Sequence, residues 1–343
     1  MPSNVSSAAD EGIIPVIIDS GSKSCRVGFA GDDTPKVIYN CSKFAWGQNP
    51  APIQRGRVAD WESLEALWSE ALIDKEIGYV DSPILFTEAT LLTKFDREKT
   101  TQVAFESFNS TGTYLTNQAA MALYANGMTT GLVLDSGHGI THSVPVIEGS
   151  PFYSGIVSME LAGMDLTEYL QKFTGRSDYC EMLKEKACEV SLNPQKIDSS
   201  TNVSFSLPDG QEILVGKERY LCPEILFQPR LLNRETNSLA VHEAIYHSVQ
   251  RFDHGTRRDL YSNIVLAGGS TMFQNFDTRL TRELTTIVQL SFKVAVSALP
   301  EGGKYSSWLG ASILASLSTF QKMWITKQDY HEWGPAIVHR KCN

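Results

Sequence analysis

The chain has 343 residues, of which 42% are hydrophobic and 10% aromatic, and its formal net charge is −9. This length suggests about two domains, and the apolar content is enough for large buried cores. A net negative charge argues against electrostatic capture of nucleic acid, so we expect no direct nucleic-acid binding. No apolar run reaches the ~20 residues that span a bilayer, so we expect no membrane insertion.

The first twelve residues are polar and lack the basic and apolar segments of a secretory signal. Six cysteines are scattered along the chain, without the paired spacing of a zinc site or of a small disulfide scaffold. We therefore expect reduced thiols and a cytoplasmic protein.

The first predicted element is a buried strand over 13–18, followed by the turn Asp19-Ser20-Gly21 and a second apolar segment over 25–29. Such a turn exposes backbone N–H groups that can surround phosphate oxygens, and an Asp at the strand end can hold a divalent ion through water. A single turn of this composition is more often an ordinary hairpin.

A polar connection over 36–52 precedes the regular structure of the first half. Helical spacing and capping residues predict helices there, with one strand between them. The expected helices cover 60–68, 97–108 and 115–124, and the strand covers 84–87.

The same turn recurs as Asp135-Ser136-Gly137, between apolar runs over 132–134 and 140–147. Two facing hairpins of this kind would form a nucleotide clamp. A third element, 263–273, combines a strand with a Gly-Gly turn, and glycines there allow the backbone to approach a flat ligand closely. The repeat predicts two α/β domains with a ligand cleft between them.

The second half continues the alternation of helices and strands. We expect a hairpin around Pro208-Asp209-Gly210, which joins strands within 203–215. The expected helices cover 165–173, 181–190, 238–252, 278–288 and 308–323.

These residues resemble the actin family, whose fold superfamily also includes sugar kinases and the heat-shock chaperone ATPases. The resemblance runs over nearly the whole chain and is densest at 29–33, 129–137, 314–321, 323–328 and 334–342. It implies an α/β, two-domain actin-like ATPase fold: ribonuclease H-like duplicated domains with a nucleotide cleft between them. The first domain would be 1–125 plus 306–343, and the second 126–305.

By position, the resemblance implies that Gln118 and His142 place the attacking water and that Asp19 and Asp135 hold Mg²⁺ or Ca²⁺ through water. Hydrolysis of a phosphoanhydride depends mostly on such positioning and on charge neutralisation, and Asp135 belongs to this catalytic set. The residues expected to bind ATP or ADP are Asp19, Gly21, Ser22, Arg26, Asp135, Gly137, His138, Gly139, Lys184, Glu185, Gly268, Gly269, Ser270, Phe273 and Lys304. Each polar residue taken alone could be a solvated surface side chain.

Several positions depart from the family pattern at the expected site. Lys23 stands where the family usually has Gly, Arg26 replaces a Lys, and His138 replaces an acidic residue. Leu92 replaces an Asn and Ser158 an Arg at two positions that help to gate phosphate release in actin. We expect nucleotide binding to survive these changes more readily than regulated hydrolysis.

The outer lobes are also shorter than in actin. The lobe of the first domain, with the loop that inserts into the next protomer, is reduced to about 38–52. The lobe of the second domain, about 174–250, is shortened between 173 and 181. Because filaments need heterologous contacts repeated end to end, we do not expect ordinary homofilaments.

The resemblance further implies a groove at the base of the two domains that accepts amphipathic helices of actin-binding proteins. Its residues would be Tyr124, Gly127, Leu317, Thr319 and Met323. The alternative interpretation places these residues in the core around the C-terminal helix.

The function expected from the resemblance is that of a cytoskeletal, ATP-binding protein that joins or caps actin filaments, with hydrolysis left open. One alternative is a nucleotide-stabilised, non-filament subunit of a larger complex, as in nuclear chromatin remodellers. A small-molecule kinase would need a catalytic Asp base and a substrate pocket in the first domain, which the sequence does not display. The shortened lobes are also what decay of an actin would leave.

Overall fold

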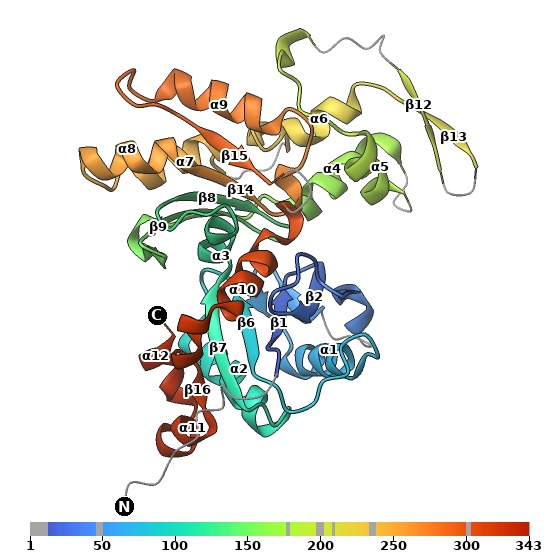
Figure 1. Ribbon diagram of the computed structural model, residues 1–343. Coiled ribbons are helices and arrows are strands. Elements are labelled where there is room, and N and C mark those ends of the chain that lie inside the picture. The colour runs from blue at the N-terminus through green and yellow to red at the C-terminus, as the bar shows by residue number, and fades with distance from the viewer. Residues whose placement is uncertain are drawn as a thin grey trace, which may run out of the picture. The chain divides into compact units, whose positions relative to one another are not determined.

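The computed structural model describes residues 13–45, 51–175, 179–196, 202–207, 210–232, 238–299 and 303–342. The chain divides into two compact units, one formed by Met1–Ala125 with Tyr305–Asn343 and the other by Asn126–Lys304. Each unit combines a sheet with helices, so the fold is the mixed α/β fold that was expected (Figure 1).

The first unit contains a six-stranded sheet in the order β16-β7-β6-β1-β2-β3. β1 is antiparallel to β2 and parallel to β6, which in turn is parallel to β7. All residues of β1, β6 and β7 are buried, as expected for apolar strands in the middle of a covered sheet. The strands are β1 Val16–Ser20, β2 Ser24–Phe29, β3 Val37–Asn40, β6 Ile84–Glu88, β7 Gly112–Asn117 and β16 Ile325–Thr326, and a separate ribbon pairs β4 Ile53–Gln54 with β5 Arg57–Val58.

Side-chain caps set the starts of the first two helices of this unit. The Asp60 side chain accepts from the backbone N–H of Ser63, and Thr93 forms a capping box with Asp96. The helices are α1 Trp61–Ile73, α2 Lys94–Glu106, α3 Gln118–Ala125, α10 Ser306–Ser316, α11 Lys327–Trp333 and α12 Val338–Lys341.

The C-terminal part of the chain packs into the first unit through α10, which lies along α3 (Figure 1). A Cβ atom at Gly310 would lie 1.9 Å from the carbonyl oxygen of Met121, so only glycine permits this crossing. Trp308 is fully buried, and its Nε1 donates to the carbonyl oxygen of Ile17 in β1 at 3.3 Å. These contacts attach residues 305–342 to the sheet that contains the first turn.

The second unit contains a sheet in the order β10-β9-β8-β14-β15, with β11 also paired to β9. β8 is antiparallel to β9 and parallel to β14, the same arrangement that β1 has with β2 and β6. The strands are β8 Gly131–Ser136, β9 Thr141–Ile147, β10 Ser150–Pro151, β11 Val157–Met159, β14 Ile264–Ala267 and β15 Val296–Ala298.

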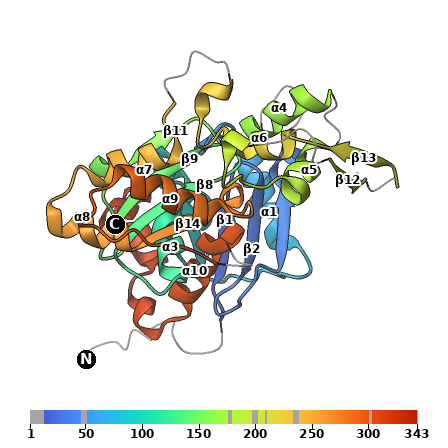
Figure 2. The same ribbon diagram turned by 90° about the horizontal axis from the view of Figure 1, so that it is seen from above.

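Apolar residues from the strands and helices of the second unit form one large buried cluster. Arg279 is buried next to it and forms a bidentate ion pair with Glu224, both N–O distances being 2.9 Å. The hairpin of β12 Val203–Ser206 and β13 Glu212–Val215 extends away from the rest of this unit (Figures 1 and 2). The helices are α4 Gly163–Thr174, α5 Cys180–Ala187, α6 Glu218–Glu224, α7 Val241–Val249, α8 His254–Ser262 and α9 Phe276–Ile287.

Several predicted helices differ from the structure. The helix predicted over 181–190 ends at Ala187, because Cys188 is extended and Glu189 bridges to Gln274. The helix predicted over 238–252 covers only Val241–Val249.

Two further predicted helices also differ from the structure. Residues 115–117 belong to β7, because these buried residues pair with β6, and the helix begins only at Gln118. The helix predicted over 308–323 ends at Ser316, and Leu317 is extended before a short 3-10 helix, Ser318–Lys322. Hydroxyl side chains compete for backbone hydrogen bonds, which favours a helix end there.

The hairpin predicted within 203–215 is confirmed in its strands, whereas Pro208 and Asp209 of its turn lie outside the described residues. Residues 46–50 of the reduced first lobe lie outside them as well. Among the helices of the described ranges, none has the length and apolar character to cross a membrane.

Candidate functional site: two equivalent turns

The two Asp-Ser-Gly turns have the same backbone construction. In the first, Asp19 pairs with Arg26 across the hairpin, and the N–H of Gly21 donates to the carbonyl oxygen of Ser24 at 2.9 Å. In the second, Asp135 pairs with His142, and the N–H of Gly137 donates to the carbonyl oxygen of Ile140 at 3.1 Å. The two sequence repeats therefore form hairpins in which corresponding residues are paired in the same register.

Asp19 is only 1% exposed and is held by three side chains of its own unit. Thr87 Oγ1 donates to Asp19 Oδ1 at 2.5 Å, and Gln118 Nε2 donates to the same oxygen at 2.9 Å. Arg26 Nη1 donates to Asp19 Oδ2 at 2.8 Å. The buried carboxylate is thus balanced by a guanidinium from the neighbouring strand.

Gln118 is the first residue of α3 and is fixed to the first turn. Besides Asp19, its Nε2 also donates to the carbonyl oxygen of Ser20 at 3.2 Å. With the amide nitrogen anchored, the side-chain carbonyl oxygen is the atom that can accept a hydrogen bond from a water.

Two segments between β3 and α1, the β4–β5 hairpin and the 3-10 helix Cys41–Phe44, contact the first turn. In the β4–β5 hairpin, Arg55 and Gly56 have φ angles of 43° and 73°, and the N–H of Gly56 donates to Ser22 Oγ at 3.3 Å. The thiol of Cys41 donates to the carbonyl oxygen of Gly21 at 3.3 Å. The sequence interpretation did not include Arg55 or Thr87, because only chain topology brings them to the turn.

His142 lies deep in the second turn and is 4% exposed. Its Nδ1 lies 2.8 Å from Ser158 Oγ, in the register position that pairs β11 with β9. Desolvation by burial lowers the pKa of His142 to about 4, so the imidazole is neutral near pH 7. Ser158, expected only as a departure from the family pattern, is therefore a direct partner of a predicted catalytic residue.

The loop that closes the second turn packs against the start of α4 and against Ser270. Backbone N–H groups of Gly163 and Met164 donate to the carbonyl oxygens of Gly137 and His138 at 3.0 and 2.8 Å. Ser270 Oγ donates to the carbonyl oxygen of Gly137 at 2.9 Å. These bonds fix the orientation of the peptide groups of the turn.

Gly268 approaches the second turn so closely that no other residue fits. Its φ is +81°, and a Cβ atom would lie 2.4 Å from the carbonyl oxygen of Ser136 and 2.6 Å from Asp135 Oδ1. The Gly-Gly turn is thus built against the backbone of the second turn, whereas Gly269 has no atom within 4 Å of an added Cβ.

The remaining predicted ligands of the second unit occupy different environments. Lys184 is 6% exposed, and its Nζ donates to the carbonyl oxygen of Gly163 at 2.9 Å and to Thr167 Oγ1 at 2.7 Å. Its ammonium therefore braces the start of α4 behind the turn. His138 Nδ1 lies 4.0 Å from Glu181 Oε1. Of the other predicted ligands, Gly139 is buried, Phe273 is half-buried, and Glu185 and Lys304 are exposed.

The two Asp residues differ in how well they suit a hydrated divalent ion. Asp135 is half-buried at the end of β8, where a carboxylate can accept from water ligands of an ion. Asp19 already accepts from three donors, one of them cationic, and does not fit that role. Within the described ranges, no cluster of three or more His, Cys, Asp or Glu could hold a metal directly.

The residues of the predicted partner groove are largely accessible. In the first unit, Leu317 is 37% and Met323 45% exposed, Thr319 is exposed and Tyr124 is half-buried. Gly127, in the second unit, is exposed as well. The alternative that Leu317 and Met323 are core residues is therefore wrong, because α10 ends before them.

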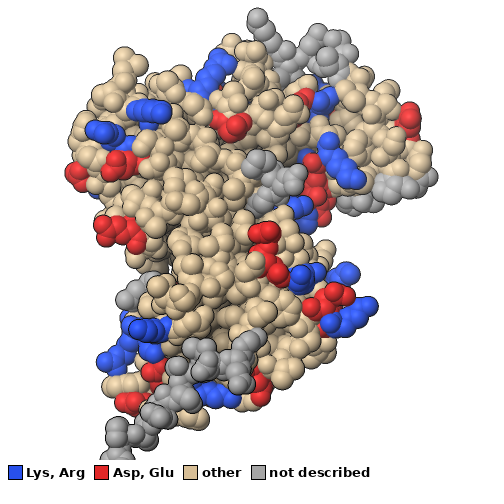
Figure 3. All heavy atoms as spheres, in the orientation of Figure 1, with Lys and Arg blue, Asp and Glu red and all other residues tan. Residues whose placement is uncertain are grey.

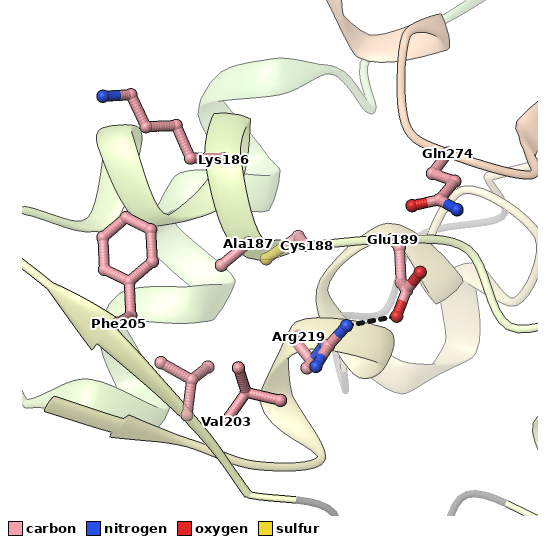
Figure 4. Close-up of a pocket in the computed structure, with 9 residues that line it drawn as sticks. Lys186, Ala187, Cys188, Glu189, Val203, Phe205, Arg219 and Gln274 are labelled. Carbon is pink, nitrogen blue, oxygen red and sulfur yellow. Dashed lines mark hydrogen bonds and ion pairs between the residues drawn. The ribbon is translucent and has the colours of Figure 1, made fainter.

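A pocket of about 190 Å³ lies elsewhere in the second unit, beside the end of α5 (Figure 4). An ion pair between Arg219 and Glu189 lies in its wall. Its described lining consists of Lys186, Ala187, Cys188, Glu189, Val203, Phe205, Val215, Arg219 and Gln274, and includes none of the predicted nucleotide ligands. On the face in Figure 3, basic and acidic side chains are interspersed.

The model of the family described as Actin matches this chain. The family model matches residues 44–179 and 175–343, which together make up most of the chain. The first turn lies before the first matched segment, so its assignment depends on its structural equivalence with the second turn. With this coverage, and with the duplicated strand–turn–strand unit in a two-unit α/β fold, the chain belongs to the actin family.

Proposed function

We propose that this protein is an actin-like protein of the cytoskeleton that binds ATP or ADP at its two turns and contacts actin or actin-binding proteins. The observation that carries the proposal is the repeated hairpin, with an Asp at the same register position in each copy. Backbone N–H groups in such turns favour phosphate oxygens. Members of the actin family generally bind ATP or ADP with a divalent cation, and Asp135 is the carboxylate here that suits one.

We expect ATP hydrolysis, if it occurs, to be weak. Gln118 keeps only its carbonyl oxygen for a water, because its amide nitrogen is held by Asp19 and Ser20. His142 is neutral, nearly inaccessible and bonded to Ser158, which limits its contact with a water. The burial of His142 and its bond to Ser158 weaken the positioning on which phosphoanhydride hydrolysis depends.

The proposed partner surface consists of Leu317, Thr319 and Met323, which follow α10, together with Tyr124 near the end of α3, which packs along α10. Two exposed apolar side chains next to a helix end suit the apolar face of an amphipathic helix. Such a surface would accept helices of actin-binding proteins.

Isothermal titration calorimetry with ATP and Mg²⁺ tests nucleotide binding directly. Gly268→Ala should weaken binding by at least tenfold, because the new Cβ displaces the Asp135–Ser136 backbone. The matched control is Gly149→Ala, with a similar φ of +82° but no atom within 4 Å of the new Cβ. Equal affinities for the wild type and Gly268→Ala would contradict the assignment of this turn.

A second candidate function is a nucleotide-stabilised subunit of a larger complex, of the nuclear chromatin-remodelling type. The reduced outer lobe favours it, because only a short 3-10 helix, Cys41–Phe44, and the β4–β5 hairpin are described between β3 and α1. Co-sedimentation with actin filaments separates the two candidates: binding supports the cytoskeletal function, and its absence supports the subunit of a complex.

A further inference from the structure

The cross-strand partners of the two Asp residues differ in charge. Arg26 lies opposite Asp19 and donates to it at 2.8 Å, with side-chain exposures of 18% and 2%. His142 lies opposite Asp135 and is neutral near pH 7. At this equivalent cross-strand position, Arg26 supplies a positive charge to Asp19, whereas neutral His142 supplies none to Asp135.

The donors around Asp19 occupy the positions that water ligands of a divalent ion would need. A carboxylate accepts about four hydrogen bonds. Thr87, Gln118 and Arg26 already account for three at Asp19, and the residue is 1% exposed. Mg²⁺ dehydrates reluctantly and keeps several waters, so it needs acceptors that face its shell.

We infer that Arg26 takes the place of the divalent ion at the first turn, so that the phosphates of ATP or ADP bind there without one. The inference rests on the proposed nucleotide binding. A buried, unneutralised Asp19 would repel phosphate, and the ion pair with Arg26 removes that repulsion. The bond to Asp19 uses one of the five guanidinium donors, whose planar arrangement matches phosphate oxygens.

A second arginine lies next to the same turn. The Gly56 N–H bond to Ser22 Oγ places the tip of the β4–β5 hairpin against the turn, and Arg55 is the residue before Gly56. Lys23 belongs to the turn itself. Arg26, Arg55 and Lys23 are thus three basic residues within or next to the first turn. Such a concentration of positive charge favours a polyanion over a further cation.

Calorimetric titration of the full chain with ATP, once in Mg²⁺ and once in EDTA, tests the inference. The measured quantity is the ratio of the Kd in EDTA to the Kd in Mg²⁺. An ion at Asp135, as proposed above, would also lower the Kd in Mg²⁺, so the ratio of the wild type is the reference value. The inference is tested by how this ratio changes when Arg26 is replaced.

Arg26→Met should raise this ratio at least tenfold above that of the wild type, because Asp19 then requires an ion for neutralisation. The matched control is Arg97→Met, which breaks the ion pair with Glu88 in the same unit. That pair has a similar N–O distance, 2.9 Å, and similar exposures, 17% and 7%. A ratio for Arg26→Met no larger than that for Arg97→Met would overturn the inference.

Thermal unfolding without nucleotide checks that each variant is folded, and Arg26→Gln replaces Arg26→Met if the latter does not fold. The inference and the proposed function fail in different ways. Nucleotide binding by Arg26→Met with a ratio no larger than that for Arg97→Met overturns the inference and leaves the proposed function intact. No heat at millimolar ATP in either buffer overturns both.

Discussion

Arg26 and His142 occupy the same register position in two copies of one hairpin. Arg26 forms an ion pair with Asp19, whereas burial keeps the imidazole of His142 neutral, so the two cross-strand residues differ in charge. The residue at this register position therefore determines whether the hairpin itself supplies a positive charge to its Asp.

Burial of His142 predicts a pH-dependent stability. Its pKa is lowered from an ordinary value near 6.5 to about 4, so the unfolded chain binds more protons between these values. The contribution is complete above pH 6.5 and is lost as the pH falls towards 4. Between pH 6.5 and 5 we expect a loss of about 2 kcal/mol in the free energy of unfolding, measured by urea denaturation.

His142→Gln should flatten this part of the pH profile, because Gln does not titrate. His331→Gln is the control, since it removes a histidine side chain from an exposed position. A His142→Gln profile as steep as that of the wild type would show that other groups cause the dependence.

The repeated Asp-Ser-Gly sequence was enough to predict both turns, since the apolar runs on each side are strong strand signals. The partners of the turns could not be predicted in the same way. Lys184 is buried against Gly163 and Thr167, 21 and 17 residues earlier, and only tertiary packing brings these groups together. Ser158 reaches His142 through the pairing of β11 with β9.

At the scale of elements, the crossing of α3 and α10 determines how the C-terminal residues join the first unit. The apolar pattern of 308–323 predicted one long helix, but α10 ends at Ser316. Periodicity indicates which residues face a core and says little about where a helix ends, since caps and tertiary contacts decide the end. This early end is what exposes Leu317 and Met323.

Gly310→Ala should destabilise the first unit by at least about 3 kcal/mol, because the new Cβ would lie 1.9 Å from the Met121 carbonyl oxygen. Urea denaturation measures the loss. Ser316→Ala, an exposed position of the same helix, should change stability by no more than about 0.5 kcal/mol. If Gly310→Ala is as stable as Ser316→Ala, the close crossing is incorrect.

At the scale of the whole molecule, the described residues include a turn-bearing sheet in each unit, and the sequence resemblance predicts a reduced outer lobe for the first unit. A filament requires two complementary surfaces on every protomer. If one of these surfaces is lost, nucleotide binding remains possible, but protomers can no longer repeat the contact from end to end.

We therefore expect the purified protein to remain in the supernatant after high-speed centrifugation with ATP, Mg²⁺ and physiological salt. Actin under the same conditions is the control and should pellet. A protein that pellets with a concentration threshold would show that the reduced lobe does not prevent assembly.

The central proposal is that the protein binds ATP or ADP through its Asp-Ser-Gly turns, and thermal unfolding during a titration with ATP and Mg²⁺ tests it most directly. A ligand that binds only the native state stabilises it by RT ln(1 + [L]/Kd), about 2.7 kcal/mol at one hundred times the Kd. We predict a midpoint that rises continuously with ATP concentration. An unchanged midpoint at millimolar ATP would contradict the claim.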